Sequence, residues 1–103
     1  MRIKMRDPEI MSQVKEILAK ISKIAPGHAV ELRIPPYSAI QCVEGPKHTR
    51  GTPPNVVEMS AEVLFDISAG KITWRDAIGD GRISASGERS DLSSLFLQLA
   101  NAK

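Results

Sequence analysis

Apolar residues at helical spacing mark the first element that the chain predicts. A helix starts at Asp7-Pro8, because aspartate caps a helix well and proline fits its first turn, and it ends before Gly27. Its apolar stripe consists of Ile10, Val14, Ile17, Leu18, Ile21 and Ile24. This spacing predicts an amphipathic helix with one buried face, and residues 1–6 before it are expected to form a loose arm.

Residues 60–87 predict two short helices followed by a strand, with a glycine at each break. Ser60 and Thr73 are good N-capping residues for the two helices, and Gly70 is the expected left-handed stop of the first helix. Residues 82–86 then alternate between apolar and polar side chains. This alternation is typical of a half-buried strand, so the segment predicts a helix–helix–strand unit against which the rest of the chain packs.

Alternation also predicts the other strands. In residues 30–34 apolar side chains alternate with charged ones, which indicates a strand with one wet face. Pro35-Pro36 then forces a turn, so residues 39–44 are expected to pair with the first strand in antiparallel fashion. Residues 56–59 form a third strand, and Lys71-Ile72 is a candidate short edge pair.

The last helix is expected to begin near Ser90 or Asp91. Its buried stripe consists of Leu92, Leu95, Phe96 and Leu99. Leu97 falls off this stripe, and no residue from 92 to 102 is charged. Core packing is the favoured interpretation of so neutral a helix, while coverage of a cavity, contact with a partner and contact with a membrane stay open as alternatives.

Composition limits the classes of function. The chain has 103 residues, enough for a single domain over 1–103, and 42% of them are hydrophobic, which is ordinary for a globular protein. A net charge of +2 without an aromatic and basic platform does not favour nucleic-acid binding. The sequence shows neither a signal peptide nor a membrane span, and one cysteine favours a reducing compartment, so a cytoplasmic protein without stable membrane insertion is expected.

The segment 45–54 is the most polar and least regular part of the chain. It places Lys47, His48, Thr49 and Arg50 in a row between glycines and prolines. Such donors can converge on a carboxylate or phosphate, because arginine offers a fork and glycine exposes backbone N–H groups. A solvated loop of positive residues is an equally weighted alternative.

No residue pattern indicates a catalytic centre, a metal site or a cofactor. Cys42 and the two histidines lack the paired spacing of a structural zinc site. Gly79 and Gly81 follow a helix rather than a strand, which excludes a dinucleotide loop. A Cys42–His48 nucleophile pair is conceivable, but Cys42 lies in the middle of a strand, where a small buried thiol is the common case.

The chain resembles the sterol carrier protein type-two family, in particular a small stand-alone bacterial branch. The general tail pattern is carried by Leu64, Gly70-Lys71, Ala77, Gly81, Ile83, Gly87, Leu92, Leu95 and Leu99. The more specific run is His-Thr-Arg-Gly-Thr-Pro-Pro-Asn at residues 48–55. The chain departs from many members at Glu88-Arg89, where they place Asp or Asn after the glycine that ends the strand.

The resemblance implies an α+β fold: a single, mostly antiparallel sheet of four to five strands with helices packed on one face. It also implies an apolar tunnel between sheet and helices for a fatty acyl or sterol-like molecule. The candidate tunnel residues are Phe65, Trp74, Ile78, Phe96 and Leu99, and the candidate head-group residues are His48 and Arg50. A closed core is the alternative to a tunnel, since a chain this short has little apolar volume to spare.

Two classes of function follow, neither of them needing catalysis. The first is binding or carriage of an apolar or amphiphilic small molecule. The second is an accessory domain that docks onto an enzyme or onto a second copy of itself through the neutral last helix. An enzyme that uses Cys42 and His48 is the weakest of the hypotheses.

Overall fold

The computed structural model describes residues 7–45 and 55–101, so residues 1–6, His48 and Arg50 lie outside the described residues. The helices are α1 (Pro8–Ile24), α2 (Ala61–Ser68), α3 (Trp74–Gly79) and α4 (Ser93–Asn101). The strands are β1 (Val30–Ile34), β2 (Ser38–Cys42), β3 (Asn55–Met59) and β4 (Ile83–Ser86). The predicted order of elements is confirmed.

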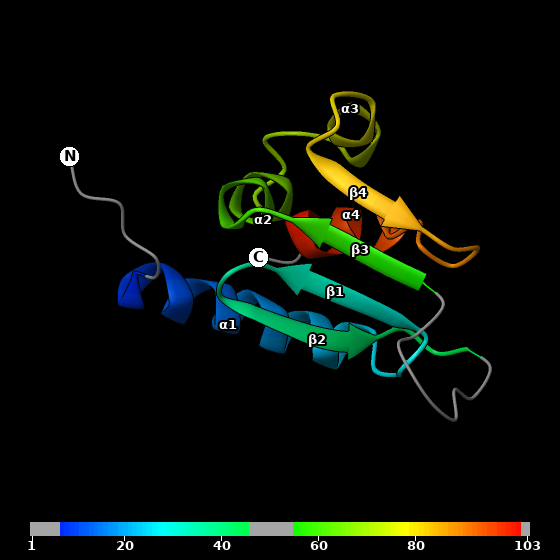
Figure 1. Cartoon of the computed structure of the whole chain (residues 1–103), viewed down its shortest axis with the longest axis horizontal. Coiled ribbons are helices and arrows are strands. Elements are labelled where there is room, and N and C mark those ends of the chain that lie inside the picture. The colour runs from blue at the N-terminus through cyan, green and yellow to red at the C-terminus, as the bar shows by residue number, and fades with distance from the viewer. Residues whose placement is uncertain (1–6, 46–54, 102–103) are drawn as a thin grey trace.

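The four strands form one mixed sheet in the order β2-β1-β3-β4 (Figure 1). β1 pairs with β2, and β3 with β4, in antiparallel fashion, which confirms a mostly antiparallel sheet. The central pair, β1 with β3, is parallel. The prediction of an edge pair at residues 71–72 is wrong, because these residues form a bend between α2 and α3.

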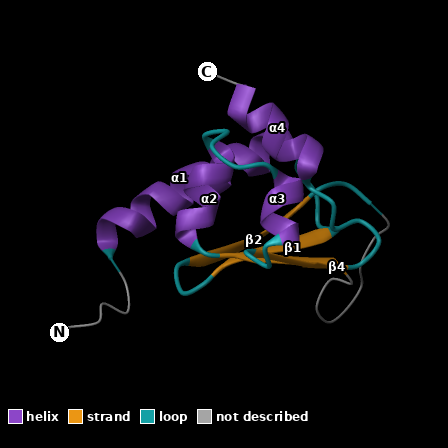
Figure 2. Cartoon of the chain, turned by 90° about the horizontal axis from the view of Figure 1, so that it is seen from above, coloured by secondary structure: helices purple, strands orange, loops and turns teal. Residues whose placement is uncertain are grey.

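All four helices lie on one face of the sheet, as Figure 2 shows from above. Along β1 the side chains of Val30, Leu32 and Ile34 are fully buried toward the helices, while Glu31 and Arg33 are half-buried. The helices close over these strand residues with Leu18, Leu64 and Phe96, among others. The strict alternation of β1 therefore places the core between sheet and helices.

Capping residues determine where three of the helices begin. Asp7 accepts hydrogen bonds from the backbone N–H groups of Glu9 and Ile10, and Ser60 accepts one from Val63. Thr73 caps α3 in the same way. These caps confirm the predicted starts, whereas α4 begins at Ser93, slightly later than expected, after a turn in which Asp91 accepts a hydrogen bond from the Ser93 N–H.

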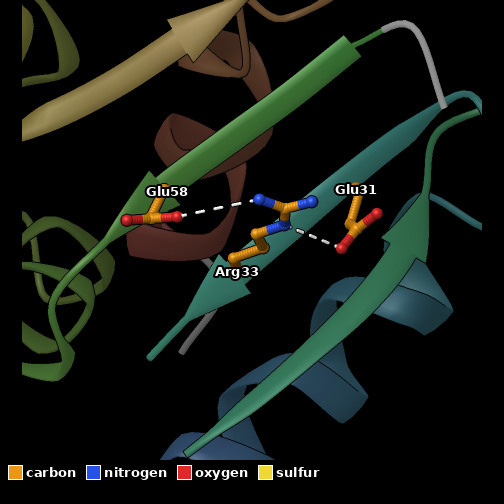
Figure 3. A network of polar contacts seen from close by, with 3 residues as sticks. All are labelled: Glu31, Arg33 and Glu58. Atoms are coloured by element: carbon orange, nitrogen blue, oxygen red, sulfur yellow. Dashed lines mark hydrogen bonds and ion pairs between the residues drawn. The ribbon is translucent and has the colours of Figure 1, made fainter. Parts of the chain in front are cut away.

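The face of the sheet opposite the helices is polar. Arg33 lies between two carboxylates on this face (Figure 3): its Nε is 2.8 Å from Glu31 Oε2, and a terminal nitrogen is 4.0 Å from Glu58 Oε1. The Arg33 side chain is 40% exposed, so these ion pairs contribute little to stability. A mostly polar, solvated sheet face of this kind needs no second layer of helices to cover it.

Asn55 is one of two buried polar residues within the described ranges, with 5% of its surface exposed. Its Nδ2 donates to the carbonyl of Ala29 at 2.8 Å, and its Oδ1 accepts from the backbone N–H of Arg89 at 2.9 Å. The carboxamide therefore joins three segments: the approach to β1, the start of β3 and the connection from β4 to α4.

Candidate ligand grooves along helix α4

A cluster of buried apolar side chains lies between sheet and helices in the described part of the chain. Its largest fully buried side chains include Phe96, Leu18, Ile21, Leu32, Ile34 and Leu64. Two grooves flank α4 and offer apolar space that solvent can reach, and Ala100 lines both of them. These grooves are the candidate ligand sites.

The first groove, here called the Trp74 groove, has a volume of about 290 Å³. It is lined by Ile67, Gly70, Ile72, Thr73, Trp74, Arg75, Ser93, Phe96, Leu97 and Ala100. The Trp74 and Phe96 rings are stacked, with centroids 6.1 Å apart and planes inclined by 20°. This aromatic pair forms a rigid apolar wall between α3 and α4, suited to a flat or extended apolar molecule.

The second groove, here called the Ser68 groove, has a volume of about 350 Å³. It is lined by Ile17, Lys20, Lys23 and Ile24 of α1, Ser68 at the end of α2, and Leu99 and Ala100 of α4. Both volumes are near the lower end of small-molecule sites, which span about 300–1,000 Å³. The two grooves therefore suit small or single-chain ligands.

The structure distributes the residues predicted to line a tunnel over several places. Trp74 and Phe96 line the Trp74 groove, and Leu99 lines the Ser68 groove. Phe65 is half-buried against the core, and Ile78 on α3 is 38% exposed; neither lines the two grooves. Three of the five residues therefore border apolar space.

Sequence reasoning missed the polar residues of the Ser68 groove. Lys20 stands three positions after Ile17 and four before Ile24, so it belongs to the same helix face as these apolar neighbours. That spacing was a usable signal. No such signal was present for Ser68, because its burial depends on α1 and α4, which lie far away in the sequence.

Two further properties concern the described residues as a whole. Over 7–45 and 55–101, no helix is long and apolar enough to cross a membrane. Within the same ranges, no group of three or more histidine, cysteine, aspartate or glutamate side chains is placed to hold a metal ion.

Cys42 is a poor nucleophile in this fold. The residue is fully buried at the end of β2, and its burial raises the pKa of the thiol from 9.0 to about 11. The reactive species of a cysteine is the thiolate, which this environment suppresses near neutral pH. The geometry of Cys42 therefore argues against the catalytic hypothesis.

The same pKa shift predicts a loss of stability in alkaline solution. Between about pH 9 and pH 11 the unfolded chain releases the thiol proton while the folded chain keeps it, so the free energy of unfolding falls as the pH rises. A shift of this size corresponds to about 2–3 kcal/mol. Urea denaturation of the wild type and Cys42→Ala across this window measures it, because other titrating groups are common to both proteins. If the free energy of unfolding falls by the same amount in both proteins across this window, the prediction is wrong.

Leu97 and Leu99, two positions apart on α4, lie on nearly opposite faces of the helix and provide a test of its orientation. Leu97 is 65% exposed, whereas Leu99 is 8% exposed, as the sequence predicted. Leu97→Gln should change the free energy of unfolding by less than about 0.5 kcal/mol. Leu99→Ala should lower it by about 2–3 kcal/mol, the lower part of the usual range, because Leu99 borders an open groove.

Thermal or urea denaturation of the two variants checks this contrast. Gel filtration of Leu97→Gln beside the wild type adds a separate readout. A change from dimer to monomer in Leu97→Gln would favour the docking hypothesis over a ligand groove.

Comparisons with known proteins place this geometry in context. Residues 6–97 match the model of a family described as bacterial SCP ortholog, which covers most of the chain. Among solved structures, the sterol carrier protein domain 2 of Helicoverpa armigera superposes with a TM-score of 0.58, at 17% sequence identity and over 98% of each chain. At this identity the likeness concerns the fold alone. A search of curated proteins found no match.

Proposed function

The chain belongs to the family of bacterial SCP orthologs, and from this premise we propose that it binds a lipid-like or other apolar small molecule without catalysing a reaction. The fold that it shares with a sterol carrier protein domain supports carriage as the general activity. The ligand class within this proposal is a fatty acyl or sterol-like molecule, and the fold alone does not choose between these.

The observation that carries the proposal is the Trp74 groove. Its wall is the stacked pair of Trp74 and Phe96, and its lining is mostly apolar. Binding would bury apolar surface of the ligand, which contributes up to about 0.8 kcal/mol for each buried methylene group. In this proposal Trp74, Phe96 and Leu99 contact the apolar part of the ligand, while Phe65 and Ile78 would require a rearrangement of α2 or α3 to reach it.

The single tryptophan makes the proposal directly testable. Trp74 lines the groove, so its fluorescence should change when octanoate, decanoate or laurate is added, and affinity should rise along this series. Native mass spectrometry of freshly purified protein gives a second readout through any co-purified ligand. Absence of binding for the whole series would refute the carrier proposal and favour the docking hypothesis.

The head-group residues proposed from the sequence, His48 and Arg50, can be tested in the same assay. Arg50 is the better candidate, because its charge persists at any relevant pH and its fork suits a carboxylate. Arg50→Ala should weaken laurate binding by about 1–3 kcal/mol and leave methyl laurate almost unaffected. Equal losses for both ligands would exclude Arg50 as a head-group contact. A contribution from His48 would make binding weaker as the pH rises.

A further inference from the structure

We propose that the Ser68 groove holds the anionic head group of a single-chain amphiphile, with Lys20 and Lys23 supplying the charge and the Ser68 hydroxyl a hydrogen bond. This inference rests on the proposed lipid-binding function and assigns it a polar subsite. The chain of the ligand would lie over Leu99 and Ala100, and Ala100 also lines the Trp74 groove.

The first observation is an unpartnered hydroxyl. The Oγ atom of Ser68 is buried and is the one buried side-chain nitrogen or oxygen, among those of the described residues, without a hydrogen-bond partner. A buried polar group without a partner is energetically unfavourable, typically by about 1–3 kcal/mol. Ser68 also lines the groove, so a rotation of its side chain would let a carboxylate or phosphate oxygen there accept a hydrogen bond from the hydroxyl.

The second observation is charge. Lys20 and Lys23 are exposed at the same groove, three positions apart on α1, and no ion pair between described residues engages either of them. Glu16, one turn before Lys20, is not paired with it in the structure. Two unpaired ammonium groups beside an apolar groove are complementary to an anion that carries a hydrocarbon chain.

The ends of three helices reduce this positive potential without cancelling it. α1 ends at Ile24, α2 at Ser68 and α4 at Asn101, so all three direct the negative end of the helix dipole toward this region. Each helix end is equivalent to about half a negative charge, and the effect falls off within one turn. Two full lysine charges exceed this sum, so the groove remains attractive to an anion.

The size and lining of the groove restrict the occupant. A volume of about 350 Å³ suits one hydrocarbon chain better than a bulky two-chain lipid. Ile17, Ile24 and Leu99 provide apolar contacts along it. The ligand class is therefore a monomeric fatty-acid anion or an alkyl phosphate of similar length.

The test compares laurate, methyl laurate and dodecyl phosphate by calorimetric titration of the intact chain, below the concentration at which they form micelles. The wild type should bind laurate and dodecyl phosphate more tightly than the neutral ester, and added salt should reduce this preference. Lys20→Gln/Lys23→Gln should weaken both anions by at least tenfold and leave the ester unchanged, as expected for losing charge-assisted hydrogen bonds. Lys15→Gln is the matched control, because Lys15 is exposed on α1 but lines neither groove.

Ser68→Ala gives an independent signature. Removal of an unpartnered buried hydroxyl should leave the melting temperature of the free protein unchanged or higher. The same variant should bind laurate at least about fivefold more weakly, because the ligand loses a hydrogen-bond donor. A lower melting temperature together with unchanged laurate affinity would show that Ser68 has a structural role only, and would overturn the proposal.

Other outcomes distinguish this inference from the function on which it rests. If wild type binds laurate and its ester but the double lysine variant keeps the preference for the anion, the lipid-binding function stands and this subsite is refuted. If Arg50→Ala loses the preference for the anion while the double lysine variant keeps it, the Ser68 groove is refuted as the head-group site. The segment 45–54 would then hold the head group. If the lysines affect only binding to vesicles that contain phosphatidylglycerol, the site is a membrane contact, and the proposal of a monomeric ligand fails.

Discussion

Replacement of Phe96 by alanine should lower the free energy of unfolding by about 3–5 kcal/mol. Phe96 is 2% exposed and is the largest fully buried side chain among the described residues, so its removal leaves a cavity in the core beneath α4. It also removes the ring against which Trp74 stacks. Urea denaturation followed by circular dichroism measures the loss, and a change of less than about 1 kcal/mol would contradict the packing of α4 described above.

Phe96→Leu is the matched variant that separates core packing from ligand binding. Leucine keeps most of the apolar volume, so the free energy of unfolding should fall by no more than about 1.5 kcal/mol. The aromatic wall of the Trp74 groove is lost in this variant, however. A weaker affinity for laurate in a protein that remains stably folded would assign a direct binding role to the ring, whereas unchanged affinity would restrict Phe96 to the core.

Replacement of Asn55 by alanine should lower the free energy of unfolding by about 2–4 kcal/mol. The variant leaves the buried carbonyl of Ala29 without its partner, at about 1–3 kcal/mol, and removes the hydrogen bond to the N–H of Arg89, an exposed residue, at about 1 kcal/mol. Ala29 is buried, so water cannot readily replace the carboxamide there. Urea denaturation measures the change.

Gln41→Ala is the control for Asn55, since it removes a carboxamide of the same chemistry from an exposed position. Gln41 Oε1 is 2.8 Å from His28 Nδ1 at the protein surface. Water can take over both partners, so this substitution should change stability by less than about 0.5 kcal/mol. Similar losses of unfolding free energy in the two variants would show that the buried hydrogen bonds of Asn55 stabilise the fold no more than an exposed one does.

Much of the fold could be predicted because its signals are local. Ser60 and Thr73 cap their helices through hydrogen bonds to residues three positions later, and the positive φ of +79° at Gly70 ends the turn after α2. The alternation in β1 needs only the two-residue period of a strand. Where the local signal was weak, as at residues 71–72, the prediction of a strand pair was wrong.

The candidate site could be predicted only in part. Trp74, Phe96 and Leu99 were identified because large apolar residues at helical spacing must face something apolar. The proposed tunnel assignment of Phe65 and Ile78 depended on which side of α2 and α3 would border open space, and periodicity does not decide that. Lys20 and Lys23 could not be identified in this way, since a charge next to an apolar stripe is usually solvent-exposed and does not by itself indicate a ligand site.

The sequence by itself determined where helices and strands begin, which of their faces are apolar, and the family to which the chain belongs, because these properties depend on neighbouring residues or on a pattern of residue types. Only the tertiary structure decided the parallel pairing of β1 with β3 and the position of Asn55 between three segments. It alone also placed Ser68 beside Lys20 and Leu99. A groove is the space that side chains of three helices leave between them, so its shape and chemistry depend on contacts between residues far apart in the chain.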